Sequence, residues 1–181
     1  NHIIAINKTT SEIVQGDKTG DEPLSEKIKH YLKEKYNKPG EVFLGVTHRL
    51  DRPVSGVVLF ARTSKALTRL NEMFKTKEVE KTYWAVVQNK PKEAEGRLEH
   101  YLVRNEKQNK SFAYDSERQN SKRASLTYRL IASSERYHLL EVRLETGRHH
   151  QIRCQLAAMG CPIKGDLKYG SPRSNPNQGI S

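Results

Sequence analysis

Strand-like segments outnumber helical ones along this chain, and several follow one another directly in the sequence. The apolar run at 57–60, after Gly56, has the pattern of a strand buried on both faces. Alternating apolar and polar residues at 137–145 indicate instead a strand with one face in water. Direct succession of strands favours an α+β fold over alternating βαβ units. We therefore predict a mixed or largely antiparallel sheet flanked by helices and loops.

Local signals place the other elements. Further strands are predicted near residues 3–6, 82–88, 97–103 and 124–132. Three helices are predicted: one from a Ser25 cap to about Tyr36, one capped by Thr63 or Ser64, and one over 149–159 that ends at Gly160. The segment 15–24 is predicted to be a loop, and the polar stretch 104–122 a long, mobile, basic loop. The length of 181 residues suits a single domain with a sizeable core.

The charge balance of the chain points to a polyanionic partner. Thirty-two Lys and Arg residues against 21 Asp and Glu residues leave a formal net charge of +11. Such a surplus attracts nucleic acid but does not choose between RNA and DNA. No apolar run approaches the ~18 residues that a membrane-spanning helix needs. The two cysteines, Cys154 and Cys161, make no disulfide framework and fit a reducing, cytoplasmic location.

The segment Thr47–Gly56 places an acidic side chain between two basic ones. Asp51 lies between Arg49 and Arg52, directly before the buried strand. The neighbouring guanidinium groups favour the ionised carboxylate, and a carboxylate held at a strand end can act as a nucleophile, a base or a metal ligand. The alternative is an ordinary surface turn in which Asp51 pairs with Arg49 or Arg52.

The predicted strand at 82–88 carries two adjacent aromatic residues. Tyr83 and Trp84 would point to opposite faces of a sheet. One of them can then pack in the core while the other lines a cleft, where an aromatic ring in a basic protein can stack on a base. The alternative is that both are packing residues.

The third segment, Glu145–Leu156, joins a strand end, a glycine turn and the start of a helix crowded with Arg and His. Helix N-termini attract anions, and arginines there add contacts to phosphate or carboxylate groups. His150 and Cys154 have a spacing compatible with zinc, but no second ligand pair follows at a recognisable spacing, so no metal is predicted. The alternative is a solvated basic helix start.

Taken together and in order, these motifs resemble the RluA-like pseudouridine synthases. The resemblance rests on four motifs: His48-Arg49-Leu50-Asp51 with Ser55-Gly56, Lys81-x-Tyr83-x-Ala85, Gly147-Arg148-x-His150-Gln151-Ile152-Arg153, and Gly160-x-Pro162-Ile163-x-Gly165-Asp166-x-x-Tyr169-Gly170. It spans about residues 1–171. It implies a pseudouridine synthase catalytic fold over 1–181, truncated at the C-terminus and without the S4 RNA-binding domain that some members carry. Cys154-Gln155 depart from the small residue and histidine of many members.

The resemblance also implies roles for individual residues. Asp51 would be the catalytic aspartate, Tyr83 the tyrosine that stacks on the target base, and Arg153 the arginine that pairs with the aspartate. Arg49 would fill the gap left by the extruded nucleotide. The other residues expected to contact RNA or support the site are His48, Arg52, Arg148, His150 and Gln151. The partner would be structured RNA, either ribosomal or transfer RNA.

Isomerisation of uridine to pseudouridine involves no net redox change, so neither a metal nor a nucleotide cofactor is expected. Asp51 could attack C6 of the base or assist departure of uracil at C1′ of the sugar. Two other classes of function compete with this one. A non-catalytic RNA-binding module could share the fold, although it would not require Asp51, Tyr83 and Arg153. A metal-dependent nuclease would need clustered carboxylates or histidines, and the motifs offer a single candidate acid.

Overall fold

The computed structural model describes residues 2–17 and 19–181, so Lys18 of the predicted loop 15–24 lies outside the described residues. The chain forms two compact units, Asn1–Val79 and Glu80–Ser181. Nothing in the sequence patterns had indicated this division, and the single catalytic domain expected over 1–181 stays a prediction. Each unit is built around its own antiparallel sheet.

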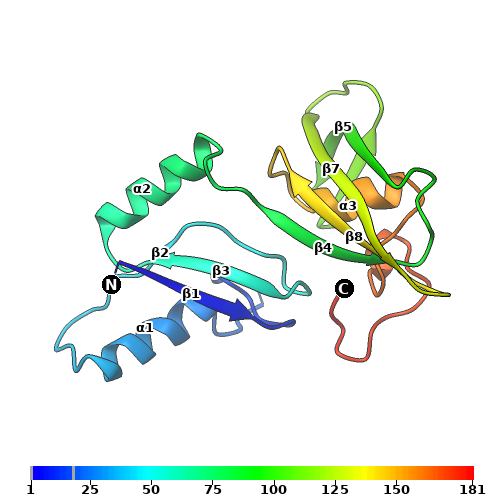
Figure 1. The fold of residues 1–181 in the computed structure, drawn as a ribbon. Helices are drawn as coiled ribbons and strands as arrows, with labels where there is room; N and C mark the ends of the chain where they lie inside the picture. The colour runs from blue at the N-terminus through cyan, green and yellow to red at the C-terminus, as the bar shows by residue number, and fades with distance from the viewer. Residues whose placement is uncertain (1, 18) are drawn as a thin grey trace. The chain divides into compact units, whose positions relative to one another are not determined.

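The first unit is a three-stranded sheet with a helix on each face. Its elements are β1 (Ile3–Lys8), α1 (Leu24–Lys35), β2 (Gly45–Val46), β3 (Gly56–Ala61) and α2 (Ser64–Lys75). The strand order is β1-β3-β2, with β3 antiparallel to both neighbours. Alternate residues of β3 face opposite sides: Val58 and Phe60 pack with α1, and Ala61 packs with α2. Figure 1 shows the two helices on opposite sides of the strands.

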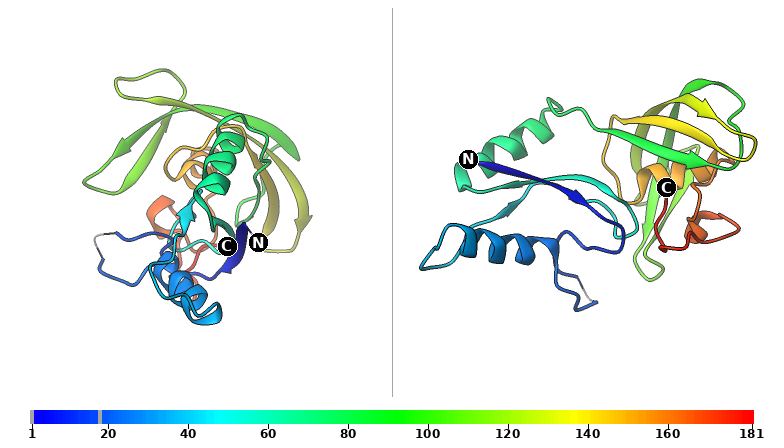
Figure 2. Two further views of the ribbon diagram at one scale, coloured as in Figure 1. Left: turned by 90° about the vertical axis from the view of Figure 1, so that its left-hand side faces the viewer. Right: turned by 60° about the horizontal axis from the view of Figure 1, so that its bottom comes forward.

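The second unit is a five-stranded sheet that curves around one helix. Its elements are β4 (Thr82–Val87), β5 (Glu95–Asn105), β6 (Lys110–Tyr114), β7 (Lys122–Ser133), β8 (His138–Leu144), α3 (Gln151–Ala158) and the short 3-10 helix η1 (Leu167–Tyr169). The strand order is β4-β8-β7-β5-β6, and every pairing between these strands is antiparallel. Figure 2 shows α3 against the concave side of these strands.

The core of the second unit lies between the sheet and α3. Leu126, Leu140 and Val142 are fully buried on the inner face and pack with Leu156 of α3. The segment after α3 runs along the outer edge of β4. There the Lys164 N–H donates to the Val86 carbonyl at 2.8 Å, and the Val86 N–H donates to the Ser181 carbonyl at 2.8 Å. The last residues are therefore hydrogen-bonded to the edge strand.

The structure confirms the α+β class and the largely antiparallel pairing, and it corrects three details. The predicted Ser25 cap is wrong, because α1 begins at Leu24 after Pro23 and Ser25 is buried within it. The third helix begins at Gln151 rather than at 149, because His150 adopts a left-handed backbone conformation with φ 52°. The stretch 104–122 is not simply a loop, since it holds the end of β5 and all of β6. The Thr63 cap of α2 is confirmed by its hydrogen bond from the Ala66 N–H.

Candidate active-site residues

The loop that carries Asp51 is fixed at both ends by the sheet of the first unit. Before it, the Thr47 hydroxyl donates to the Leu59 carbonyl at 2.6 Å, and the Leu59 N–H donates to His48 Nε2 at 3.1 Å. After it, Gly56 enters β3 with φ 141°, a conformation that a residue with a Cβ rarely adopts. The Val54 N–H closes a turn on the Asp51 carbonyl at 3.0 Å. Asp51 is half-buried, at the tip of a loop with a defined path.

A buried lysine also holds this loop, through hydrogen bonds to its backbone carbonyls. Lys8, the last residue of β1, is 0% exposed, and its ammonium donates to the carbonyls of Thr9, Arg52 and Val54 at 2.9, 3.2 and 2.6 Å. Burial lowers the pKa of Lys8, and the negative charges of Glu12 and Asp51 partly oppose that effect. Lys8 therefore places a positive charge on the buried side of the loop, near the Asp51 carboxylate.

The basic residues beside Asp51 differ in their surroundings. Arg49 and Arg52 are both exposed, and Arg52 pairs with Asp21 across 2.7 Å. His48 is half-buried, with its ring centroid 5.2 Å from that of Phe74. Arg49 is thus placed where a large ligand can reach it, whereas His48 is tied to the protein by its ring and its Nε2 atom. RNA contacts by these residues stay predictions.

The two aromatic residues of β4 point to opposite faces of the sheet, as the strand pattern predicted. Trp84 is 70% exposed on the outer face. Tyr83 is half-buried and packs against the cluster of core residues on the inner face, the face that α3 covers. Within the second unit, Tyr83 therefore lies on the same side of the sheet as the helix that carries Arg153.

The turn between β8 and α3 is held by one buried amide. The Gln151 side chain is 3% exposed; its Oε1 accepts from the Arg148 N–H at 2.9 Å and from the Thr146 hydroxyl at 2.8 Å, and its Nε2 donates to the Ser125 carbonyl at 3.0 Å. These bonds give Gln151 a role inside the protein. A direct contact between Gln151 and RNA stays a prediction. Arg148 is exposed, and its Nε donates to the Arg123 carbonyl at 3.0 Å.

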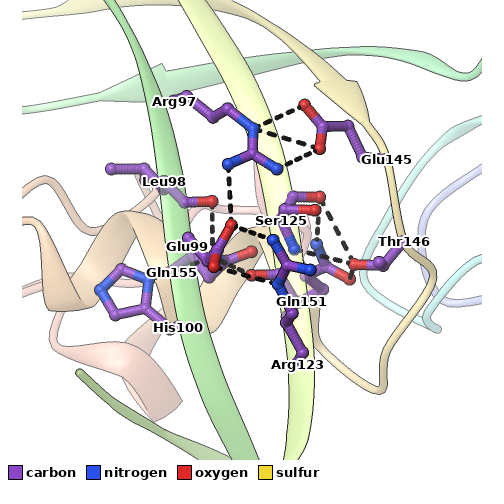
Figure 3. Close-up of polar contacts among 11 residues, drawn as sticks. Arg97, Leu98, Glu99, His100, Arg123, Ser125, Glu145, Thr146, Gln151 and Gln155 are labelled. Carbon is purple, nitrogen blue, oxygen red and sulfur yellow. Dashed lines mark hydrogen bonds and ion pairs between the residues drawn. The ribbon is translucent and has the colours of Figure 1, made fainter. Parts of the chain in front are cut away.

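Figure 3 shows an exposed network of ion pairs beside this turn. Arg97 donates to Glu145 through Nε and Nη2 and to Glu99 through Nη1, and Arg123 donates to Glu99 through Nε and Nη2. Hydrogen bonds from Arg123 and then Arg97 lower the pKa of Glu99 to about 2. Arg123 also accepts a hydrogen bond from Arg148 Nε through its backbone carbonyl.

Arg153 lies in a buried, charged environment. Its Nε and Nη2 donate to the two carboxylate oxygens of Asp166 at 2.7 and 2.9 Å, and both side chains are almost completely buried. The Tyr169 ring lies alongside, with its centroid 5.1 Å from the guanidinium carbon. Asp166 belongs to the last of the motifs that carry the family resemblance, but the sequence assigned it no role, because its partner lies on another element of the fold. The predicted pairing of Arg153 with Asp51 stays a prediction.

Two histidines stack at the start of α3 and join it to β6 and η1. The rings of His149 and His150 have centroids 3.8 Å apart. His149 Nδ1 lies 2.9 Å from Ser111 Oγ, and His150 Nδ1 lies 2.9 Å from the Tyr169 hydroxyl, which also accepts from the Ser111 N–H. These contacts tie the start of α3 to its neighbours. A contact between His150 and RNA stays a prediction.

Residues 2–17 and 19–181 contain no group of three or more His, Cys, Asp or Glu side chains arranged to hold a metal ion. None of the helices formed by these residues has the length and apolar character needed to cross a membrane. Cys154 and Cys161 are both buried free thiols, and burial raises the pKa of Cys154 to about 11.

The predicted site residues thus fall into three groups. His48, Arg49, Asp51 and Arg52 share one loop of the first unit, Tyr83 lies on the inner face of β4, and Arg148, His150, Gln151 and Arg153 gather at the start of α3. Sequence reasoning missed Lys8, and it named Asp166 within a motif without assigning it a role. The lysine ends an apolar strand and the aspartate follows a glycine, and neither signal distinguishes a buried charge from an exposed one.

Residues 2–158 match the RNA pseudouridylate synthase family. The chain is 35% identical over 176 residues to the ribosomal large subunit pseudouridine synthase C of Rickettsia bellii, covering 97% of this chain and 56% of that protein. It is 35% identical over 126 residues to the ribosomal large subunit pseudouridine synthase D of Borreliella burgdorferi, covering 70% and 38%. The chain therefore spans about half of the length of these relatives, or less.

Solved structures agree with this assignment. The fold is similar to that of human RNA pseudouridylate synthase domain containing 4, with a TM-score of 0.80 and 25% identity over 96% of this chain and 70% of that one. The human domain containing 1 protein has the same fold, with a TM-score of 0.72 at 22% identity. The family match over most of the chain and the identity to curated members lead to one conclusion: this chain belongs to the RluA-like family of RNA pseudouridylate synthases.

Proposed function

We propose that this protein isomerises uridine to pseudouridine in a structured RNA, with Asp51 as its nucleophile. The observation that carries the proposal is the position of Asp51. In a chain of this family, it lies half-buried on a loop whose path is held by Lys8, Thr47 and Gly56. A carboxylate presented in this way has the restricted geometry that covalent catalysis needs.

The other residues of the proposed mechanism would act on the base and on the charge of the nucleophile. Arg153 would bind the Asp51 carboxylate through charge-assisted hydrogen bonds and orient it. Tyr83 would stack on the extruded uracil and hold the detached base while it turns. Tyr83 lies half-buried on the α3 face of its sheet, and Trp84 on the opposite face is not part of the proposal.

The RNA must release its target base from the stack, at a cost of a few kcal/mol. The exposed Arg49 would fill the vacated position and offset part of that cost. Arg52, Arg148 and the other exposed cations of the +11 chain would bind phosphates, so affinity should fall as salt rises. Relatives carry the name of the ribosomal large subunit, so we propose large-subunit ribosomal RNA as the first substrate to test, with transfer RNA as the second.

The test compares the wild-type protein with Asp51→Asn on unmodified transcripts of both RNA classes. Pseudouridine formation is mapped by chemical derivatisation, and RNA affinity is measured in parallel. We expect no pseudouridine from the variant and an affinity within about threefold of wild type, because Asn keeps the size of the side chain without its charge or nucleophilicity. Turnover by Asp51→Asn at the wild-type rate would refute the assignment of the nucleophile.

A matched control is Asp21→Asn, which removes an exposed carboxylate of the same unit that pairs with Arg52. Its isomerisation rate should stay near that of wild type, because exposed ion pairs contribute little. A protein that binds both RNA classes and forms no pseudouridine in either would favour the RNA-binding module instead.

A further inference from the structure

Arg153 has its orientation set by a carboxylate that the proposed mechanism does not use. Asp166 is 2% exposed and receives two parallel hydrogen bonds from the guanidinium, through Nε and Nη2. A bidentate pair of this kind fixes both the position and the plane of the guanidinium, which a single hydrogen bond would leave free to rotate. The Nη1 edge then points away from Asp166 and is the edge that a second carboxylate would meet.

Asp166 is itself held rigidly by the backbone around it. Its N–H donates to the Ile163 carbonyl at 3.0 Å, and its carbonyl accepts from the N–H groups of Tyr169 and Ser171 at 3.1 and 3.0 Å. The preceding Gly165 has φ 85°, and a Cβ there would lie 2.5 Å from Asn175 Nδ2 and 2.7 Å from the Gly179 carbonyl oxygen. The turn therefore places the carboxylate in one position relative to α3.

The face of the guanidinium is covered as well as its edge. The Tyr169 ring centroid lies 5.1 Å from Arg153 Cζ, within the range of cation–π attraction. The Tyr169 hydroxyl accepts from the Ser111 N–H at 2.8 Å, so β6 fixes the ring in turn. The contacts of Asp166 with its edge and of Tyr169 with its face together restrict the guanidinium to one arrangement.

We propose that Asp166 is a positioning residue for the isomerisation, which acts by orienting the Arg153 guanidinium toward the nucleophilic carboxylate. The inference rests on the proposed function, in which Arg153 binds the carboxylate of Asp51. A guanidinium that is oriented before the RNA binds does not have to be ordered during the reaction, so the benefit falls on the chemical step. Asp166 touches neither base nor sugar in this scheme.

The test substitutes Asp166→Asn, which preserves size but turns one accepting oxygen into a donor group. We expect kcat to fall about 100-fold, with KM and RNA affinity unchanged, because misorientation of a catalytic group has effects of that order. In protein labelled with ¹⁵N-arginine, the slowly exchanging Nε–H signal of Arg153, assigned by its absence from Arg153→Lys, should be lost in Asp166→Asn. That signal reports the orientation of Arg153 without reference to activity.

The matched control is Glu99→Gln, which also removes an arginine-bound carboxylate, here one bound by Arg97 and Arg123 on the exposed network of Figure 3. It should leave kcat and the Arg153 signal unchanged. If Asp166→Asn does not fold, Asp166→Glu takes its place, because the longer side chain keeps the charge but displaces the carboxylate. A folded variant with the kcat of Glu99→Gln, or with an intact Arg153 signal, overturns the inference. A wild-type protein that forms no pseudouridine overturns the proposed function instead.

Discussion

Replacing Lys8 by Met tests whether the loop of Asp51 depends on a buried ammonium. Met fills nearly the same volume, so the substitution opens no large cavity and removes three hydrogen-bond donors. The three acceptors do not depend equally on Lys8. The Arg52 carbonyl also accepts from the Ser11 N–H at 3.0 Å, and Thr9 is an exposed residue, where water can replace the ammonium. The Val54 carbonyl receives the shortest bond, 2.6 Å, and depends most on Lys8.

The expected loss of stability follows from these differences among the three acceptors. Leaving one buried acceptor without a donor costs about 1–3 kcal/mol. Removing the ammonium also relieves the burial of a charge, the cause that lowers the pKa of Lys8. We therefore expect the free energy of unfolding to fall by about 1–2 kcal/mol, well below the sum for three independent bonds.

The assay is equilibrium urea unfolding, read as a shift of the midpoint at unchanged m-value. The control is Lys29→Met, which removes the ammonium of a half-buried surface lysine 2.8 Å from Glu26 on α1 and should cost less than about 0.5 kcal/mol. If the two variants are equally stable, the buried ammonium does not hold the loop. A loss above about 4 kcal/mol would show that all three acceptors depend on it.

Two further predictions concern titratable groups of the second unit. Burial lowers the pKa of His100 from its ordinary value of 6.5. The imidazole of the unfolded chain therefore binds a proton at a higher pH than that of the folded protein. As a result, the free energy of unfolding should fall as the pH drops below 6.5. His100→Asn keeps an acceptor for Gln155 Nε2 and should flatten that part of the stability–pH curve measured by urea unfolding; an unchanged slope would contradict the assignment. Burial raises the pKa of Cys154 to about 11 and also raises that of Cys161, so iodoacetamide at pH 8 should label neither thiol in the native protein and both in urea. Rapid labelling of the native protein would show that this core opens readily.

Several elements could be predicted because their signals are local. The strand at 56–61 follows from a continuous apolar run, and the Thr63 cap follows from a hydroxyl placed before a helical pattern. The opposite orientations of Tyr83 and Trp84 follow from the two-residue period of a strand. In each case the residues that determine the structure are neighbours in the sequence.

Other features depend on distant partners and could not be predicted. β6 is a short segment within an otherwise polar stretch of the chain, and it is a strand because it pairs with β5 and because Ser111 binds the Tyr169 hydroxyl. The start of α3 is displaced by the left-handed backbone of His150, which no hydropathy pattern reveals. Lys8 finds its acceptors 44 and 46 residues away, at Arg52 and Val54, so a charged residue at the end of a strand is buried rather than solvated.

The hydrogen bonds along the edge of β4 have a consequence for solubility. An end strand of a sheet normally offers its backbone groups to any other strand, and that is a common route to aggregation. Here the N–H and the carbonyl of Val86 are both occupied by the protein's own later segment, at Ser181 and Lys164, and Val87 forms a bridge with Ile163. A second molecule could add a strand at this position only after displacing that segment. The segment therefore blocks the pairing of β4 with a strand of another molecule at this position.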